Sequence, residues 1–174
     1  MDNENERELS DNPLDWLEDM CGQTGWSFER LGDTDITISV TEPTTHTLFV
    51  ADVRYDQRQD SLQLTFEVTQ IPDAFLEDDR RQTISALLDA VNRDVESGCF
   101  RALKNGLMIS FISVIPKSEC AIHAERHTLP ELFANYAHLC SGYQLVFGLL
   151  AQRPDDTPTA AAHILHLLKP MGTA

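Results

Sequence analysis

The sequence predicts one α+β domain, an antiparallel sheet with helices packed on it, in the order α-ββββ-α-ββ-α-α. Four short stretches alternate apolar with polar residues, which is typical of half-buried strands. Other stretches repeat apolar residues at helical spacing, which indicates amphipathic helices. Asn105-Gly106 lies between two further apolar runs and favours a tight hairpin turn. We therefore expect a four-stranded meander plus a two-stranded hairpin.

The chain starts with an acidic stretch at residues 1–10 that offers only Leu9 for burial. Such a composition favours disorder, so we expect a disordered acidic lead. The remaining residues, 11–174, show no repeat and no linker, and they are long enough for one domain. The sequence thus predicts a single domain that ends in a short helix.

The meander is predicted to follow a first helix. Asn12 can cap that helix at its start, with Pro13 in the first turn, and Gly22 or Gly25 can end it. The pattern then changes to a period of two, which indicates strands. These predicted strands lie near residues 26–28, 36–40, 46–55 and 61–69.

A long helix and the hairpin come next. The helix is predicted from about residue 78 to 96, with Gly98 as its stop. The hairpin strands are expected at 100–103 and 107–115, on either side of the Asn-Gly turn. The register of the hairpin should therefore be well defined.

Two helices are predicted in the last part of the chain. Thr128 and Glu131 have the spacing of a capping box at the start of a major core helix that runs to Leu150. A short helix follows between Pro158 and Pro170. The residues between the hairpin and the core helix are interpreted as a connection.

The strand at 107–115 is apolar on nearly both faces, although a sheet covered by helices on one side leaves its other side in water. A cover for the second face is therefore expected. One interpretation is that the chain's own long helix or tail supplies it, and the other is that a second subunit does. The predicted dimer or partner face consists of Leu107, Ile109, Phe111, Ile112 and Val114.

Candidate catalytic and metal-binding residues occur, but none completes a site. His163 and His166 share a helix face, yet no cysteine or carboxylate near them in sequence completes a metal site. Cys120 precedes His123 and His127 in the predicted connection, without an orienting group or oxyanion donor. We therefore predict no catalytic residue, no metal and no cofactor.

The remaining reactive residue types have structural interpretations. Cys21, Cys99 and Cys140 fall in apolar stretches and are expected to be inert. The acidic groups at 77–79 and 155–156 precede predicted helices, where the helix dipole favours negative charge. No glycine-rich phosphate loop is present, so nucleotide binding has no support.

The charge balance narrows the class of partner. A formal net charge of −15 repels nucleic acid and anionic membranes, so we expect neither as a partner. The acidity serves solubility or forms a docking face for a basic protein segment. A hydrophilic start, the lack of Cys-x-x-Cys and the lack of a long apolar run lead us to expect a cytoplasmic protein with reduced thiols.

Several short sequence motifs, in the order in which they occur, resemble those of the YbjN-type family, which is named for bacterial sensory-transduction regulation. These motifs are Asn12-Pro13-Leu14-Asp15, Trp26-Ser27-Phe28-Glu29-Arg30, Val91-Asn92-Arg93 before Gly98-Cys99-Phe100, and Tyr143-Gln144-Leu145-Val146-Phe147-Gly148 before an alanine-rich end. Relatives often carry histidine at Cys99 and arginine near Ser110, so the chain departs from the family pattern there.

This resemblance implies a fold similar to type III secretion chaperones, acidic proteins that commonly dimerise and hold a partner polypeptide. The resulting hypothesis is a non-enzymatic, chaperone-like or regulatory protein, homodimeric, that binds a protein or peptide. Two alternatives stay open, a small enzyme with an unrecognised Cys/His or carboxylate site, and an acidic mimic of nucleic acid.

Overall fold

A computed structural model of the chain describes residues 10–71, 78–103 and 108–152. The described elements follow the predicted order α-ββββ-α-ββ-α-α, which confirms the α+β layout. They are α1 (Pro13–Thr24), β1 (Phe28–Arg30), β2 (Asp35–Thr41), β3 (Leu48–Asp56), β4 (Ser61–Gln70), α2 (Asp78–Asn92), β5 (Cys99–Leu103), β6 (Met108–Pro116), α3 (Lys117–Glu125) and α4 (Leu129–Gln152).

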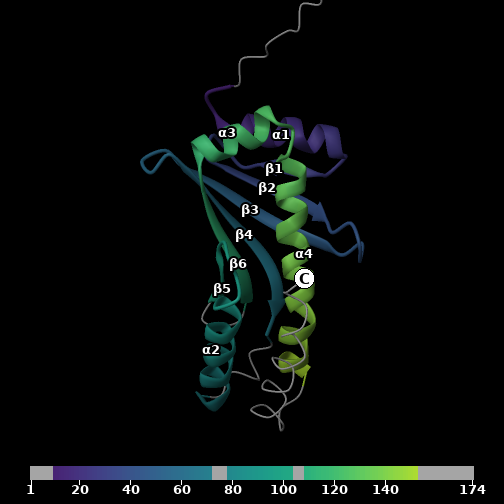
Figure 1. Cartoon of the computed structure of the whole chain (residues 1–174), viewed down its shortest axis with the longest axis vertical. Helices are drawn as coiled ribbons and strands as arrows, with labels where there is room; N and C mark the ends of the chain where they lie inside the picture. Colours follow the sequence, from purple (N-terminus) through teal and green to yellow (C-terminus); the bar gives the residue numbers. More distant parts are fainter. Residues whose placement is uncertain (1–9, 72–77, 104–107, 153–174) are drawn as a thin grey trace, which may run out of the picture.

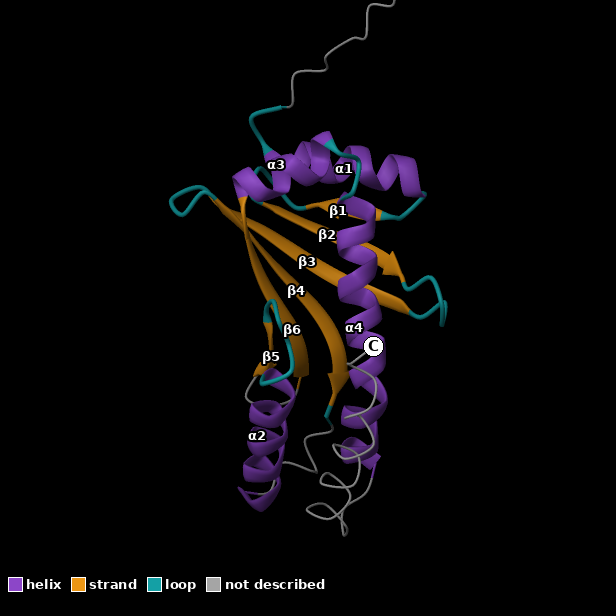
Figure 2. Cartoon of the chain, viewed as in Figure 1, coloured by secondary structure: helices purple, strands orange, loops and turns teal. Residues whose placement is uncertain are grey.

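All six strands form one antiparallel sheet in the order β1-β2-β3-β4-β6-β5. The hairpin β5–β6 therefore joins the meander through β6, which pairs with β4. Figure 1 shows α4 crossing the sheet lengthwise, with α1 and α3 at one end of the molecule and α2 at the other. The sheet and α4 thus form two layers, and the other helices lie at the two ends (Figure 2).

The core lies between the sheet and α4. Strand β2 alternates buried with half-buried residues along its whole length, as a period of two requires when one face is covered. Aromatic rings fill the layer: Phe111 of β6 lies 5.3 Å from Tyr136 of α4, and Phe100 of β5 lies 5.4 Å from Phe147. Such tilted ring pairs add to the stabilisation from buried apolar area.

The first helix begins and ends at the predicted residues. The Asn12 side chain accepts a hydrogen bond of 3.0 Å from the Leu14 backbone N–H, as expected of a cap. Gly25 ends the helix with φ of +73°, where glycine is favoured over other residues. Ser10, which the sequence assigned to the disordered lead, is in place and accepts a hydrogen bond from Trp16 Nε1 through its carbonyl oxygen.

The interpretation of the segment after β6 as a connection was wrong, because α3 occupies it. Pro116 ends the strand and precedes the helix directly, and the helix buries Cys120. Thr128 does precede α4 and its carbonyl accepts from Leu132, but its hydroxyl lies 2.8 Å from His123 Nδ1. The predicted helix between Pro158 and Pro170 lies outside the described residues.

Helix α2 ends earlier than predicted, at Asn92, for a local reason. The Asn92 amide donates to the Phe100 carbonyl at 2.9 Å, and the Phe100 N–H donates back to Asn92 Oδ1 at 2.7 Å. The Asn92 side chain thus forms hydrogen bonds with backbone groups on the outer edge of β5, and an added strand could otherwise pair with these groups. Asn92 and Phe100 both belong to one of the motifs that resemble the YbjN-type family, so this motif has a structural role in this fold.

Candidate binding face on the sheet

One face of the sheet carries no helix in the described part of the chain. Helices α1, α3 and α4 pack their buried side chains into the core on the opposite face. The outward side chains alternate with the core residues along each strand. They include Glu29 of β1, Asp35, Thr37 and Ser39 of β2, Leu48, Val50, Asp52 and Arg54 of β3, Gln63, Thr65 and Glu67 of β4, and Ile112 and Val114 of β6. We call this set the open face.

The strand register places the open-face residues in rows. Glu29 lies opposite Thr37, Thr37 opposite Asp52, and Asp52 opposite Thr65. Neighbouring strands are about 4.8 Å apart, so one row brings side chains from four strands within reach of one ligand. The Thr37 hydroxyl donates to Asp52 Oδ1 at 2.8 Å, which fixes the direction of that carboxylate.

A hollow of about 320 Å³ lies on this face. Arg54 Nε donates to Asp35 Oδ1 at 2.7 Å beside the hollow. The hydrogen bonds from Arg54 and from the Thr34 hydroxyl hold the pKa of the Asp35 carboxyl below its usual value. The residues that line the hollow are Leu31, Asp35, Ile36, Thr37, Asp52, Val53, Arg54, Gln63 and Thr65.

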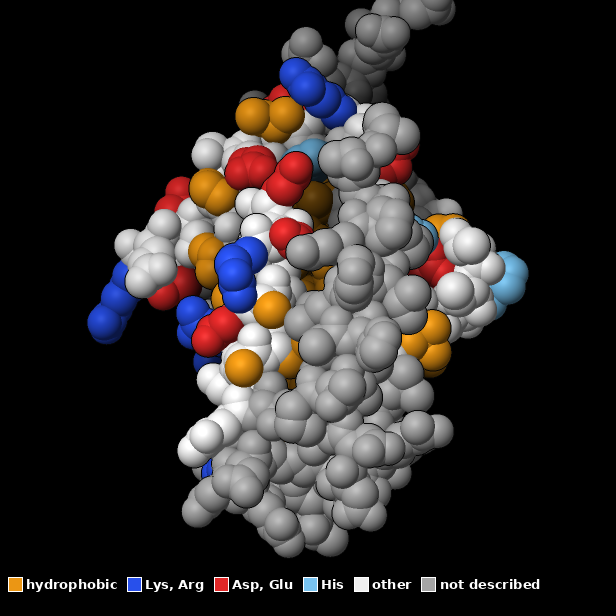
Figure 3. Space-filling model, turned by 60° about the horizontal axis from the view of Figure 1, so that its bottom comes forward, with side chains coloured by type: hydrophobic (Ala, Val, Ile, Leu, Met, Phe, Trp, Pro, Cys, Tyr) orange, Lys and Arg blue, Asp and Glu red, His pale blue; other side chains and the backbone are white. Residues whose placement is uncertain are grey.

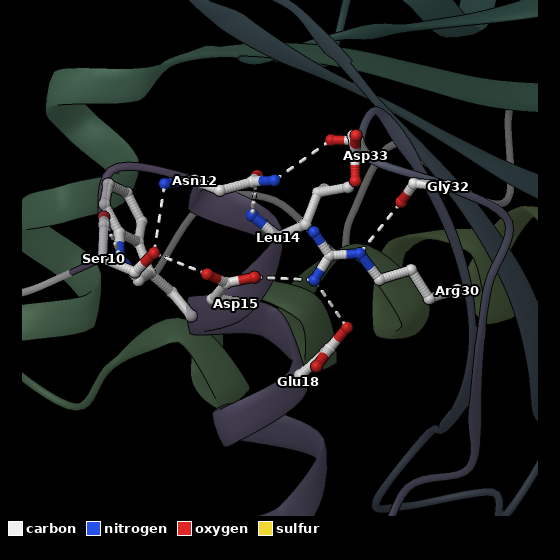
Figure 4. Close-up of polar contacts among 9 residues, drawn as sticks. Ser10, Asn12, Leu14, Asp15, Glu18, Arg30, Gly32 and Asp33 are labelled. Carbon is white, nitrogen blue, oxygen red and sulfur yellow. Dashed lines mark hydrogen bonds and ion pairs between the residues drawn. The ribbon is translucent and has the colours of Figure 1, made fainter.

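A polar cluster around Arg30 holds the turn that carries Leu31 (Figure 4). Arg30 Nη1 lies 2.6 Å from Asp15 Oδ1 and 2.7 Å from Glu18 Oε1, both on α1, and its Nε donates to the Gly32 carbonyl at 2.9 Å. Hydrogen bonding by Arg30, then by Ser10, lowers the pKa of the Asp15 carboxyl. The cluster thus fixes α1 against β1 and, with them, one wall of the hollow.

The five residues predicted to form one dimer or partner face do not share a face. Ile109 and Phe111 are both 0% exposed, because they point into the core beneath α4. Ile112 is half-buried and Val114 is 57% exposed, and both belong to the open face. The physical reason is the alternation of side chains along a strand. Leu107 lies outside the described residues. On this inner face, the Phe111 ring lies 5.3 Å from that of Tyr136 of α4. Whether the chain's own residues or a second subunit cover the other face of the strand stays a prediction.

Two of the cysteines predicted to be inert, Cys21 and Cys140, are buried, and so is Cys120, the candidate nucleophile. Burial raises the pKa of the Cys21 thiol to about 11 and that of the Cys120 thiol to about 12, and it raises the pKa of Cys140 as well. The thiolate is the nucleophilic form of cysteine, so these environments suppress nucleophilic chemistry. Cys99 is half-buried on β5.

The other candidates also remain apart. His123 contacts Thr128 across the turn between α3 and α4, and His127 lies in that turn with φ of +55°. His163, His166 and the acidic pair at 155–156 lie outside the described residues. Within the described part of the chain, no group of three or more His, Cys, Asp or Glu side chains is placed to hold a metal.

Sequence reasoning missed a buried carboxylate at Glu42, which is 1% exposed. Its Oε2 accepts from the Thr45 hydroxyl at 2.6 Å and from the backbone N–H groups of Thr44 and Thr45. His138 of α4 lies 3.0 Å from the other oxygen through Nδ1. The carboxylate therefore closes the β2–β3 loop and ties it to α4.

A sequence signal for Glu42 existed in the strand pattern. Ile36, Ile38 and Val40 point into the core, and Glu42 is the next position with the same parity. Continuing the alternation by one residue places a carboxylate where an apolar side chain is expected, which demands hydrogen-bond partners. The pair with His138 has the geometry of an oriented base, yet the described hollow lies on the opposite face of the sheet. Its evident role is to hold the loop.

The Glu42 cluster predicts a pH effect on stability. Hydrogen bonds, first from Thr45 and then from His138 and Thr44, lower the pKa of Glu42 from 4.5 to about 2. The ionised form thus stabilises the fold above pH 4.5, and this contribution is lost as the pH falls through about 2. We expect Glu42→Gln to lower the melting temperature at neutral pH, and its difference from the parent to shrink between pH 4.5 and 2.

Circular dichroism melts across that pH range measure the effect. Glu125→Gln, which removes an exposed carboxylate on α3, is the matched control and should leave the melting curve unchanged. A deficit in Glu42→Gln that stays constant down to pH 2 would contradict the assignment.

Comparison of the chain with protein-family models, with curated proteins and with solved structures finds no match in any of the three. The resemblance to the YbjN-type family and to type III secretion chaperones therefore remains a prediction. None of the helices in the described residues is long and apolar enough to cross a membrane.

Proposed function

We propose that this is a non-enzymatic, chaperone-like or regulatory protein that holds a segment of another polypeptide against the open face. The observation that carries the proposal is the open face itself, which combines a hollow of about 320 Å³ with exposed aliphatic side chains. Leu48 is 61% exposed, Val50 37% and Val114 57%. Apolar groups set among polar ones are typical of surfaces that bind proteins reversibly.

The free cysteines agree with a reducing compartment, and the proposal places the protein in the cytoplasm. Sensory transduction is the process that the family resemblance suggests for it. An acidic mimic of nucleic acid requires a continuous anionic surface. On the side shown in Figure 3, red acidic side chains are interspersed with blue basic and orange apolar ones. On that side, the described side chains do not form the continuous anionic surface that a mimic requires.

Site-specific photo-cross-linking in the source cell tests the proposal. A benzoylphenylalanine at Val50 should give cross-linked polypeptides, because this position lies on the open face. The same probe at Leu145, which is 76% exposed on α4, serves as the control. Equal yields from both positions, or none from Val50, would overturn the proposal.

The predicted homodimer is part of the same proposal and needs its own measurement. Light scattering after gel filtration gives the mass in solution, and a cross-link from Val50 to a second copy gives the surface. If the dimer persists in Val114→Lys but is lost when a residue outside the open face is substituted, the two copies associate through a surface other than the open face. A monomer at all concentrations would remove the homodimer from the proposal.

A further inference from the structure

We infer that the segment held on the open face is cationic and extended, with a lysine or arginine seated between Glu29 and Asp52. The inference rests on the proposed function and adds the chemistry of the ligand. It follows from the positions of charge on the open face and from the apolar side chains that flank them.

Two carboxylates of one row lack a cationic partner among the described residues. Asp35 has its partner in Arg54 at 2.7 Å, whereas the described contact of Asp52 is the Thr37 hydroxyl at 2.8 Å. Glu29 lies opposite Thr37 on the next strand and is exposed. The two carboxylates are thus separated by two strand spacings, about 10 Å, with the small Thr37 between them. A guanidinium or ammonium group above Thr37 can reach both.

Apolar side chains flank that row at the spacing of an extended strand. Val50 lies two residues before Asp52 on the same face of β3, and Leu31 lines the hollow with 64% of its surface exposed. A bound strand presents alternate residues to a surface, about 6.6 Å apart. Alternating cationic and aliphatic residues therefore match the open face in both charge and period.

The charge of the whole chain disfavours the other occupants. A second copy would bring its own Glu29 and Asp52 to a surface of the same sign, on a chain whose net charge is −15. Nucleic acid is repelled for the same reason. A cationic segment is attracted over a long range, which raises its rate of association at low salt.

Fluorescence anisotropy with synthetic peptides tests the inference. The probe is a labelled peptide of about ten residues in which arginine and valine alternate, long enough to cross the hollow. One comparison peptide carries glutamate for each arginine, and another carries serine for each valine. The arginine-valine peptide should bind more tightly than either, and more weakly as salt is added.

Variants of the chain locate the site. Asp52→Asn and Glu29→Gln should each weaken binding of the arginine-valine peptide by about twofold to fivefold, as expected for a charged pair on an exposed surface. Glu125→Gln on α3 removes the same charge away from the open face and should change binding by less than about twofold. All three side chains are exposed, so the variants should fold like the parent.

The possible failures are distinct. The cationic ligand is refuted if the glutamate-valine peptide binds as tightly as the arginine-valine peptide, or if Glu125→Gln weakens binding as much as Asp52→Asn. In either case, cross-linking at Val50 can still support the proposed function. If neither peptide binds, the inference fails. If cross-linking at Val50 fails as well, so does the proposed function.

Discussion

Phe111→Ala should lower the free energy of unfolding by about 3–5 kcal/mol, the range for removing a fully buried aromatic side chain. Phe111 is 0% exposed, and its ring lies 5.2 Å from that of Phe100 and 5.3 Å from that of Tyr136. Its strand also pairs it with Phe66 in register. The substitution would leave a cavity in the middle of the aromatic layer.

Val114→Ala is the matched control, because Val114 lies on the same strand and is 57% exposed. It should change the free energy of unfolding by no more than about 0.5 kcal/mol. Urea unfolding followed by circular dichroism measures both variants. If the strand bound a partner through Phe111, as the sequence suggested, the two substitutions would instead have similar small effects on the isolated chain. Similar effects would therefore contradict the structure.

This pair also shows what the sequence could predict for β6. Its strand character follows from its β-branched residues and from the Asn105-Gly106 sequence that precedes it, and both are local features; the predicted turn itself lies outside the described residues. Which of two apolar faces receives α4 depends on contacts between distant segments. The Ser113 hydroxyl, which lies 3.1 Å from the Tyr136 hydroxyl in the core, marks the inner face only once α4 is in place. From the sequence alone, a serine in an apolar strand does not indicate which face of the strand is buried.

Two further differences have the same kind of origin. Helix α3 is short and lacks a pronounced apolar stripe, with Cys120 as its buried residue, so helical periodicity could not reveal it. The partners of Glu42 come from its own loop and from His138 on α4, 96 residues away along the chain. The open face was equally hidden, because a strand pattern identifies a polar side but not the hollow that several strands form together.

Gly98→Ala is expected to be nearly as harmful as the loss of Phe111. Gly98 has φ of +84°, and a β-carbon there would lie 2.6 Å from the Ile112 carbonyl oxygen and 2.6 Å from the Phe111 ring. The backbone conformation costs about 1–2 kcal/mol for a residue other than glycine, and overpacking adds about 1–3 kcal/mol. The free energy of unfolding should therefore fall by about 2–5 kcal/mol.

Gly25 separates the two causes, because it has φ of +73° and a β-carbon added there would meet no atom within 4 Å. Gly25→Ala should therefore show the conformational cost alone, about 1–2 kcal/mol. In the double variant Gly98→Ala/Phe111→Ala, the ring contact is gone but the Ile112 carbonyl remains. Its loss of stability should be smaller than the sum of the two single losses, since neighbouring sites share a contact. Strict additivity would show that the Phe111 ring does not constrain Gly98, and equal losses at Gly25 and Gly98 would show that close packing plays no part.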